Sequence, residues 1–354
     1  MKNFYKNKKI LITGHTGFKG GWLARILTNW GADVVGVSLP AHTEPNLFSI
    51  FQLKDRLRHY EVDICNYEEL LPVFKKEQPE IVFHLAAQAL VRDSYDIPLL
   101  THKVNVFGTA VVMHAIKETP SVAAAVIITT DKVYYNDEKG RPYKEIDPLG
   151  GHDPYSASKA AADIIANSYV QSFLHLEKYG NEHKTLTGIV RSGNVFGGGD
   201  WSKDRLVPDI IRAVYHDNSD VVLRNPTSVR PWQHVLEPTS GYLLLAKKLY
   251  EGDKKYAGAW NFGPNDEMSC SVENMVQRAL LYLGRGTYVI VPDKTKPEAG
   301  ILRLDISKAK ELLGWAPRID LATSLRWTFE WYKSHYEKQN AGEVADRQIN
   351  DFFG

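Results

Sequence analysis

The sequence contains very little cysteine and almost no net charge. Its 354 residues include 2 cysteines, Cys65 and Cys270, which are too few for a disulfide framework, so we expect the chain to fold in the reducing cytoplasm. The formal net charge is +1, so no bulk field attracts nucleic acid or an anionic membrane. We therefore predict neither a nucleic-acid nor a membrane partner.

Long hydrophobic runs and metal-ligand patterns are also missing. The apolar run 10–12 behind the Lys-rich start is too short for a signal-peptide core, and we expect no run long enough to span a bilayer. The 12 histidines show no His-Glu-x-x-His or similar spacing, so we predict no catalytic metal. The length is sufficient for two subdomains around a large core.

A glycine-rich loop follows the first predicted strand. Residues 9–13 form an apolar run typical of a buried strand, and residues 21–27 continue as a helix beyond the loop. Glycines at this place let the backbone turn tightly and approach a pyrophosphate, which then lies at the helix N-terminus. The pattern predicts a dinucleotide cofactor held by Gly14, Thr16, Gly17, Phe18, Lys19 and Gly20.

The ends of the following strands supply further candidate cofactor contacts. A dinucleotide fold often has an acidic residue after its second strand to hold the adenine ribose, but this chain has Ser38 there. The sequence thus leaves NAD and NADP open, and His15 and Lys19 are candidates to hold a 2′-phosphate. Asp63 either meets the adenine or caps the helix that begins near Tyr67. We expect the remaining contacts from Ile64, Leu85, Ala86, Ala87, Gln88, Asn105 and Thr129.

The stretch 125–159 carries the residues suited to catalysis. A predicted strand, 125–128, leads into Thr130, and Asp153-Pro154 is typical of a helix start. Tyr155 and Lys159 are four residues apart, so a helix places them on one face. A Lys ammonium beside a phenol favours the phenolate, which is a general base for a hydroxyl proton. Two ordinary surface residues are the alternative interpretation of this short motif.

Alternating strand and helix patterns from residue 8 to about 190 predict an α/β fold. We expect a Rossmann-type, doubly wound parallel sheet with a smaller mixed α/β lobe. The predicted cofactor-binding domain comprises residues 1–192 and a returning segment at about 232–262. Residues 193–231 and 263–354 are then expected to form the lobe that binds the substrate, with the ligand in the cleft between them.

These residues together resemble the extended short-chain dehydrogenase/reductases, over nearly the whole chain. More narrowly, the sequence is similar to the CDP-glucose 4,6-dehydratases. The motifs that carry this resemblance are Gly14-His-Thr-Gly-Phe-Lys-Gly20, Thr129-Thr-Asp-Lys-Val133, Asp147 through Lys159, Gly193 through Trp201, and Arg224-Asn-Pro226 through Arg230-Pro-Trp-Gln-His-Val-Leu-Glu-Pro238.

The resemblance implies an internal redox reaction with NAD as the cofactor. CDP-glucose is oxidised at carbon 4, water is eliminated across carbons 5 and 6, and hydride returns to carbon 6, which supplies deoxysugars for surface polysaccharide. It implies that Thr130, Tyr155 and Lys159 serve the oxidation. Asp131 and Lys132 stand where dTDP-glucose dehydratases have an Asp acid and a Glu base. Lys132 is therefore either the base, directly or through water, or only a charge partner for Asp131.

The resemblance also implies substrate contacts and an assembly. The expected substrate contacts are Gln88, Asn194, Arg205, Arg224, Arg230 and Asn261, although Asn261 is alternatively a satisfied core amide and Arg230 a surface cation. Family members usually pair through the helix that carries Tyr155, so we expect a homodimer or homotetramer. Ala160-Ala161-Ala162 and Ile164-Ile165 are the residues expected at that contact. The loop 136–143 departs most from the family pattern.

Three alternative functions remain open from the sequence. Another sugar-nucleotide dehydratase fits the Asp131-Lys132 pair, and a nucleotide-sugar 4-epimerase needs Tyr155 and Lys159 without an acid–base pair. A cofactor-binding protein without turnover is the third, although such proteins usually lack the Tyr and Lys.

Overall fold

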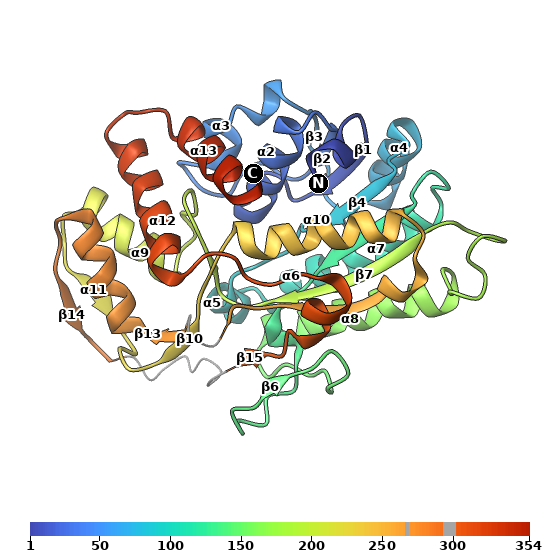
Figure 1. The fold of residues 1–354 in the computed structure, drawn as a ribbon. Coiled ribbons are helices and arrows are strands. Elements are labelled where there is room, and N and C mark those ends of the chain that lie inside the picture. The colour runs from blue at the N-terminus through green and yellow to red at the C-terminus, as the bar shows by residue number, and fades with distance from the viewer. Residues whose placement is uncertain (266–268, 293–301) are drawn as a thin grey trace.

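The computed structural model describes residues 1–265, 269–292 and 302–354. Its central sheet has seven parallel strands in the order β12-β7-β5-β4-β1-β2-β3 (Figure 1). Their bounds are β1 (Lys9–Thr13), β2 (Asp33–Val37), β3 (Arg58–Tyr60), β4 (Ile81–His84), β5 (Ala124–Ile128), β7 (Leu186–Ser192) and β12 (Gly258–Phe262). Strand order runs outward from β1 in both directions, which confirms the predicted doubly wound Rossmann-type sheet.

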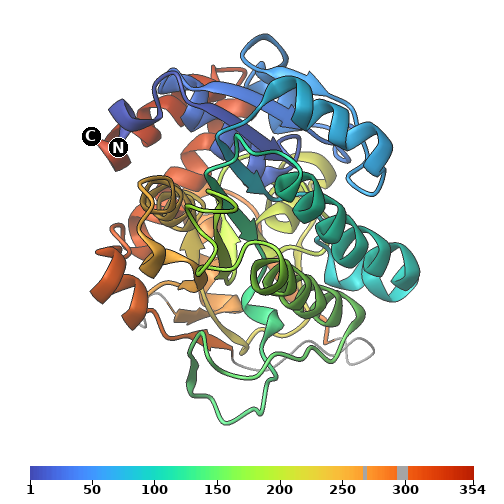
Figure 2. The same ribbon diagram turned by 90° about the vertical axis from the view of Figure 1, so that its right-hand side faces the viewer.

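Successive residues of each strand point to opposite faces of the sheet, and both faces are covered by helices. Ile10 and Ile12 of β1 belong to the buried cluster that includes Leu23 of α2 and Leu243 of α10. Leu11, between them, belongs to the cluster on the other face, formed with α4, α7 and α8 (Figures 1 and 2). The bounds of these helices are α2 (Phe18–Asn29), α10 (Leu236–Tyr250), α4 (Tyr67–Glu77), α7 (Gly108–Lys117) and α8 (Pro154–Ser172).

A smaller lobe lies at the carboxyl ends of the strands. Its two short sheets pair β9 (Val221–Leu223) with β14 (Tyr288–Ile290) in parallel, and β10 (Val229–Pro231) with β13 (Ser269–Ser271) antiparallel. They pack with the helices α9 (Leu206–Arg212), α11 (Val272–Leu283) and α12 (Leu321–Tyr336). The other elements are α1 (Lys2–Tyr5), α3 (Leu47–Ile50), α5 (Val91–Asp96), α6 (Pro98–His102), β6 (Pro142–Tyr143), β8 (Val195–Phe196), β11 (Gln233–His234), β15 (Arg303–Leu304) and α13 (Ala341–Phe353).

The C-terminal helix does not lie where we expected it. The predicted small lobe extends to residue 354, whereas α13 returns to the first domain and lies beside the N-terminus (Figure 1). Arg25 of α2, which is 5% exposed, holds Asp346 through two bonds of 2.6 and 2.7 Å. Such a bidentate Arg–carboxylate pair fixes both groups in one geometry. Trp30 and Phe353 add an edge-to-face contact at 4.9 Å.

One continuous helical segment, Pro98–Lys117, is long and apolar enough to cross a membrane by length and composition. The expectation that no such run exists was therefore wrong. Half of its most apolar window is buried inside the protein, and its α7 part packs against α4 and α8. The apolar residues of this segment thus belong to the core of the first domain.

Candidate active site

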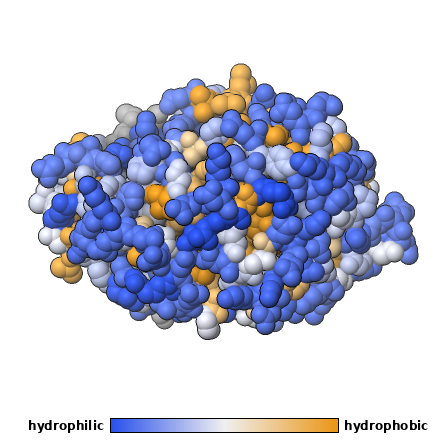
Figure 3. Space-filling model, turned by 90° about the horizontal axis from the view of Figure 1, so that it is seen from above, coloured by the Kyte–Doolittle hydropathy of each residue, from blue (hydrophilic) through white to orange (hydrophobic). Residues whose placement is uncertain are grey.

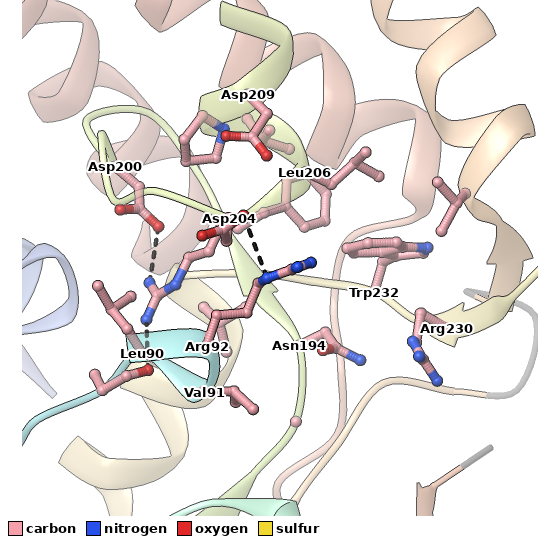
Figure 4. Close-up of a pocket in the computed structure, with 18 of the residues that line it drawn as sticks. Leu90, Val91, Arg92, Asn194, Asp200, Asp204, Leu206, Asp209, Arg230 and Trp232 are labelled. Carbon is pink, nitrogen blue, oxygen red and sulfur yellow. Dashed lines mark hydrogen bonds and ion pairs between the residues drawn. The ribbon is translucent and has the colours of Figure 1, made fainter. Parts of the chain in front are cut away.

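A cavity of about 300 Å³ lies between the carboxyl edge of the main sheet and the smaller lobe (Figure 4). Its lining includes many of the residues predicted from the sequence. These are Lys19, Thr129, Thr130, Asp131, Lys132, Tyr155, Asn194, Arg205, Arg224 and Arg230. Segments that are far apart in the sequence therefore contribute to one chamber, which is wide enough for a small organic ligand.

The end of β5 and the start of α8 place three polar side chains together. Thr130 begins a 3-10 turn, Asp131–Val133, and its hydroxyl donates a 2.9 Å hydrogen bond to Asp131. The Tyr155 hydroxyl also makes a hydrogen bond with Thr130. As predicted, Asp153 caps α8 by accepting a 2.9 Å bond from the backbone N–H of Ser156, and Pro154 follows in the first turn.

Burial changes the proton affinity of both acidic groups in this cluster. The Asp131 side chain is 5% exposed, and burial raises its pKa, while Lys132, Thr130 and Lys19 oppose the rise. Burial likewise raises the pKa of Tyr155 to about 12, while the hydrogen bond with Thr130 and the charge of Arg205 oppose the rise. Both groups consequently hold their protons more firmly than in water.

Lys159 is held by the end of β5. Its ammonium donates a 3.0 Å hydrogen bond to the backbone carbonyl of Ile128, and the largest influences on the Tyr155 pKa are burial, Thr130 and Arg205. An ammonium has three N–H donors, so the action of Lys159 on Tyr155 stays a prediction. Burial lowers the pKa of Lys159 itself to about 8.

Lys19 lies in the cavity wall and not at the end of β2. Its ammonium is 3.5 Å from the Ser192 hydroxyl, and burial, followed by Arg205 and Lys159, lowers its pKa to about 8. Ser38 instead pairs with Thr16 at 2.7 Å, and the His15 ring contacts His59 at 2.9 Å. The hypothesis that Lys19 holds a 2′-phosphate was wrong because the side chain points to the cavity.

The glycine loop forms a cradle that fits a dinucleotide. Gly14 has φ +79°, and a Cβ there would meet the backbone nitrogen of Ala86 at 2.6 Å. A Cβ at Gly20 would lie 2.1 Å from the Gly14 carbonyl oxygen, whereas at Gly17 it would lie 3.4 Å from the same atom. No side chain caps the N-terminus of the 12-residue helix α2, so its N–H groups are available to an anion.

Several residues predicted to touch the cofactor have partners within the protein. Asn105 is 1% exposed, exchanges two hydrogen bonds with the Gln88 backbone and donates a third to Ser158, so it joins the end of β4 to α8. The Gln88 side chain bonds the backbone of Leu90; Leu90 lines the cavity, whereas Gln88 does not. Thr129 donates to Asp163 and to a carbonyl of β7. The side chains of Asn105, Gln88 and Thr129 therefore hold the carboxyl edge of the sheet in place.

Two further expectations changed near the ends of β3 and β12. β3 ends at Tyr60, and the Asp63 carboxylate beyond it accepts a 2.9 Å bond from the Cys65 N–H, which makes a turn, so Asp63 does not cap α4. Asn261 is 0% exposed and binds Tyr134, Tyr143 and Asp305. It is a satisfied core amide, and the structure does not bring it to the cavity.

The sequence reasoning missed four residues at the cavity. Arg92, Asp204 and Trp232 line it, and a Cβ on Gly193 would lie 2.8 Å from the Asp131 carboxylate, so only glycine leaves that carboxylate room. Gly193 belongs to one of the family motifs, but the sequence does not indicate that it lies next to the Asp131 carboxylate. Asp204 and Arg92 carry no local sequence signal. The structure shows no group of three or more metal-ligating side chains in residues 1–265, 269–292 and 302–354.

Comparison with known proteins gives a consistent result. Residues 11–328 match the family model described as GDP-mannose 4,6 dehydratase. CDP-glucose 4,6-dehydratase of Salmonella typhimurium is 43% identical over 352 residues, which covers 99% of this chain and 98% of that protein. This match and the family model both cover most of the chain.

Two solved structures share the fold. The dTDP-glucose 4,6-dehydratase of Bacillus anthracis, in complex with NAD, has a TM-score of 0.76 and 22% identity, with coverage of 95% of this chain and 99% of that one. The UDP-glucose 4-epimerase of Thermotoga maritima has a TM-score of 0.78 and 24% identity, with coverage of 92% and 99%. On the family model and the 43% identical relative, the chain belongs to the GDP-mannose 4,6 dehydratase family.

Proposed function

We propose that the protein is an NAD-dependent hydro-lyase that converts CDP-glucose to CDP-4-dehydro-6-deoxyglucose and water. The observation that carries the proposal is the cluster of Tyr155, Thr130 and the buried carboxyl of Asp131 at one end of the cavity. The 43% identity to a CDP-glucose 4,6-dehydratase over nearly the full length supports the choice of nucleotide.

The glycine cradle and the strand ends are the parts of the chain that fit NAD. Gly14, Gly17 and Gly20 admit a pyrophosphate at the N-terminus of α2, and the pair Thr16–Ser38 lies at the end of β2 for the adenine ribose. NAD, when bound, supplies the reversible two-electron acceptor that an internal redox reaction requires. We expect Gly17→Asp to abolish NAD binding, measured by calorimetry, because its carboxylate meets the pyrophosphate. Gly17→Ala is the matched variant: the fold has room for its Cβ.

Tyr155 is the group that removes the proton from the sugar 4-hydroxyl. Thr130 holds the hydroxyl beside it, and the Thr130 hydrogen bond and the Arg205 charge both favour the phenolate. Burial still raises the Tyr155 pKa to about 12, so the bound ligands must lower it before Tyr155 can act as a base. Lys159 has a pKa of about 8, so part of its population is neutral near neutral pH.

Asp131 and Lys132 serve the elimination. The raised pKa of Asp131 keeps its carboxyl protonated at a higher pH than usual, which suits an acid that protonates the leaving 6-hydroxyl. Lys132 follows it in the same 3-10 turn and also lines the cavity, so it is the candidate base for the carbon-5 proton. Gly193 preserves the space that the Asp131 carboxylate occupies.

The opposite wall is suited to the nucleoside diphosphate. Arg205, Arg224 and Arg230 all line the cavity, Arg205 towards Tyr155 and Arg224 in the smaller lobe, and guanidinium groups donate to acceptor atoms of a ligand in a forked geometry. Asp200, which is 4% exposed, holds Arg205 at 2.8 Å. Asn194 lies between Arg92 and Arg230 in the cavity (Figure 4).

Product analysis tests the proposal against its alternatives. The protein is incubated in D₂O with CDP-, UDP-, dTDP- and GDP-linked hexoses, and the products are identified by NMR. Dehydration removes one water and introduces solvent deuterium at carbon 5, whereas a 4-epimerase inverts carbon 4 without losing water. The buried carboxyl beside Tyr155 favours dehydration, because epimerisation uses no acid at carbon 6. Absence of any reaction would instead support a binding protein.

We also infer a cytoplasmic homodimer. The surface that it would use consists of exposed apolar side chains on the helices around α8. The face seen in Figure 3 is mostly hydrophilic. By contrast, Leu99 and Leu100 on α6, Phe107 before α7 and Ile164 on α8 are all exposed. Ala160 and Ala162 are buried within the chain's own core and do not contribute.

Light scattering tests the dimer at assay concentration. Ile164→Asp is expected to give a monomer, since it places a carboxylate in the apolar contact. Leu281→Asp, on α11 and more exposed to solvent than Ile164, is the control and should leave the molar mass unchanged. A monomeric wild-type protein would refute the assembly.

A further inference from the structure

Asp204 stands in the cavity wall in an unusual conformation. Its φ is +56°, in the left-handed region that few residues other than glycine adopt. Its carboxylate holds two arginines from distant elements, Arg224 after β9 at 2.7 Å and Arg92 of α5 at 3.7 Å (Figure 4). Both distances run to the same oxygen, Oδ1, so neither ion pair uses Oδ2.

Asp204 and the next residue serve opposite ends of the cavity. The Arg205 charge acts on Tyr155, at the catalytic end, whereas the Asp204 carboxylate pairs with Arg224 in the smaller lobe. A nucleotide sugar with its hexose at Tyr155 extends through its diphosphate towards that lobe. Its nucleobase therefore comes to lie beyond the diphosphate, on the side of Val222, Leu223 and Arg224, which line the cavity there.

We propose that the Asp204–Arg224 pair reads the hydrogen-bonding edge of cytosine and so selects the cytidine nucleotide. This inference rests on the proposed function and adds the residues that choose its base. Cytosine presents an amino donor beside a ring-nitrogen acceptor, whereas uracil and thymine present a carbonyl acceptor beside an N–H donor. A carboxylate next to a guanidinium is the complement of the cytosine edge: Asp204 accepts from the amino group and Arg224 donates to the ring.

The charge of Asp204 argues for the base and against the diphosphate. A carboxylate repels phosphate oxygens, so a wall built only for the diphosphate gains nothing from it. The Asp204 carboxylate and the uracil carbonyl are both hydrogen-bond acceptors, so they repel each other and binding of uracil is weakened. Asp200 differs, because it is buried and bonded to Arg205 and to the Ser202 N–H. The Asp204 side chain is 30% exposed in the cavity wall, where a ligand can reach it.

Asp204→Asn tests the inference with little disturbance of the backbone. Asparagine has the same shape and tolerates the left-handed conformation. Its amide presents either a carbonyl or an amino group, so it accommodates both kinds of base edge. Calorimetry measures the dissociation constants of CDP and UDP for the wild type and the variant. We expect the preference for CDP over UDP to fall about 10- to 100-fold.

The control is Asp209→Asn, which removes another carboxylate of the same cavity. Asp209 is paired with Arg212 on its own helix at 2.6 Å, so the base preference should not change. An equal loss of CDP and UDP affinity in Asp204→Asn would overturn the inference, because Asp204 would then only align the arginines. If the wild type shows no preference for CDP, the proposed substrate is wrong and the inference fails with it. A wild-type preference that Asp204→Asn retains overturns the inference alone.

Discussion

The two walls of the cavity are built by different physical means. On the main-domain wall, Thr130 contacts both Asp131 and Tyr155, and burial changes the proton affinities of those two acidic groups. Lys159 is bonded to the end of β5 and is not part of the cavity lining. On the wall of the smaller lobe, charged side chains from segments far apart in the sequence are held by ion pairs that remain partly exposed, as Arg224 and Asp204 show.

The difference separates chemistry from recognition. A group that must move protons needs a shifted pKa, which burial provides. A group that must recognise a charged or polar ligand needs to keep its charge at an accessible surface. Substitutions on the main-domain wall should therefore lower turnover, and substitutions on the wall of the smaller lobe should weaken ligand affinity.

The largest effect is expected for Tyr155→Phe. The variant keeps the ring and removes the hydroxyl that takes the 4-hydroxyl proton, so turnover should fall by about 100- to 10,000-fold. Deuterium exchange at carbon 5 should stop as well, since that proton becomes acidic only after oxidation at carbon 4. NMR measures both, and affinity for CDP should be unchanged. Tyr135→Phe, on an exposed tyrosine, is the matched control; normal turnover by Tyr155→Phe would remove Tyr155 from the mechanism.

Asp131→Asn and Lys132→Ala should separate the acid from the base. Loss of either group is expected to slow dehydration by about 100- to 10,000-fold. Asp131→Asn leaves the base in place, so carbon 5 should still exchange with solvent deuterium. Lys132→Ala should abolish that exchange. The assignment of Lys132 as the base is wrong if this variant exchanges carbon 5 at the wild-type rate, and Lys132 is then only a charge partner.

The main-domain wall was largely predictable from the sequence because its geometry is local. Asp153 and Pro154 fix the start of α8, and helical spacing then places Tyr155 and Lys159. The sequence could not predict what surrounds these side chains in the folded protein. The Ile128 carbonyl accepts a hydrogen bond from Lys159. Burial raises the Tyr155 pKa to about 12, whereas we had expected a phenolate.

The small-lobe wall was predictable only in part. Arg224 and Arg230 were identified through family motifs, but their partners were not, because Asp204 is 20 residues from Arg224 and its backbone conformation has no sequence signal. Asn261 was misplaced for the same reason. Its amide partners, Tyr134, Tyr143 and Asp305, lie more than 40 residues away, so nothing local shows that the amide is satisfied.

A smaller effect on turnover is expected for Arg224→Ala, on the recognition wall. A lost hydrogen bond to a charged group costs about 1.5–3 kcal/mol, so KM for CDP-glucose should rise about 10- to 100-fold. The contact is the same in the ground state and the transition state, so kcat should stay nearly constant. Steady-state kinetics separate the two parameters. A fall in kcat at unchanged KM would instead place Arg224 at the reacting atoms.

The smallest effect on activity is expected for Glu237→Gln, which probes how the two regions are joined. Glu237 lies at the start of α10, directly after the segment that forms the small-lobe wall, and it is 0% exposed. One carboxylate oxygen accepts bonds of 2.7 and 2.8 Å from the backbone N–H groups of Arg318 and Ile319. Burial raises the pKa of this carboxyl from 4.5 to about 7, with those two bonds opposing the rise.

A raised carboxyl pKa means that the folded state binds the proton more tightly than the unfolded chain. The stabilisation that comes from this tighter proton binding is fully present below pH 4.5 and is lost as the pH rises through about 7. Glutamine keeps the accepting oxygen and cannot ionise, so this loss should disappear. We expect the free energy of unfolding of the wild type to fall by on the order of 1–3 kcal/mol more than that of Glu237→Gln between pH 5 and pH 8. Urea unfolding at the two pH values measures the difference, and parallel losses in the two proteins would show that Glu237 does not control the junction between the walls.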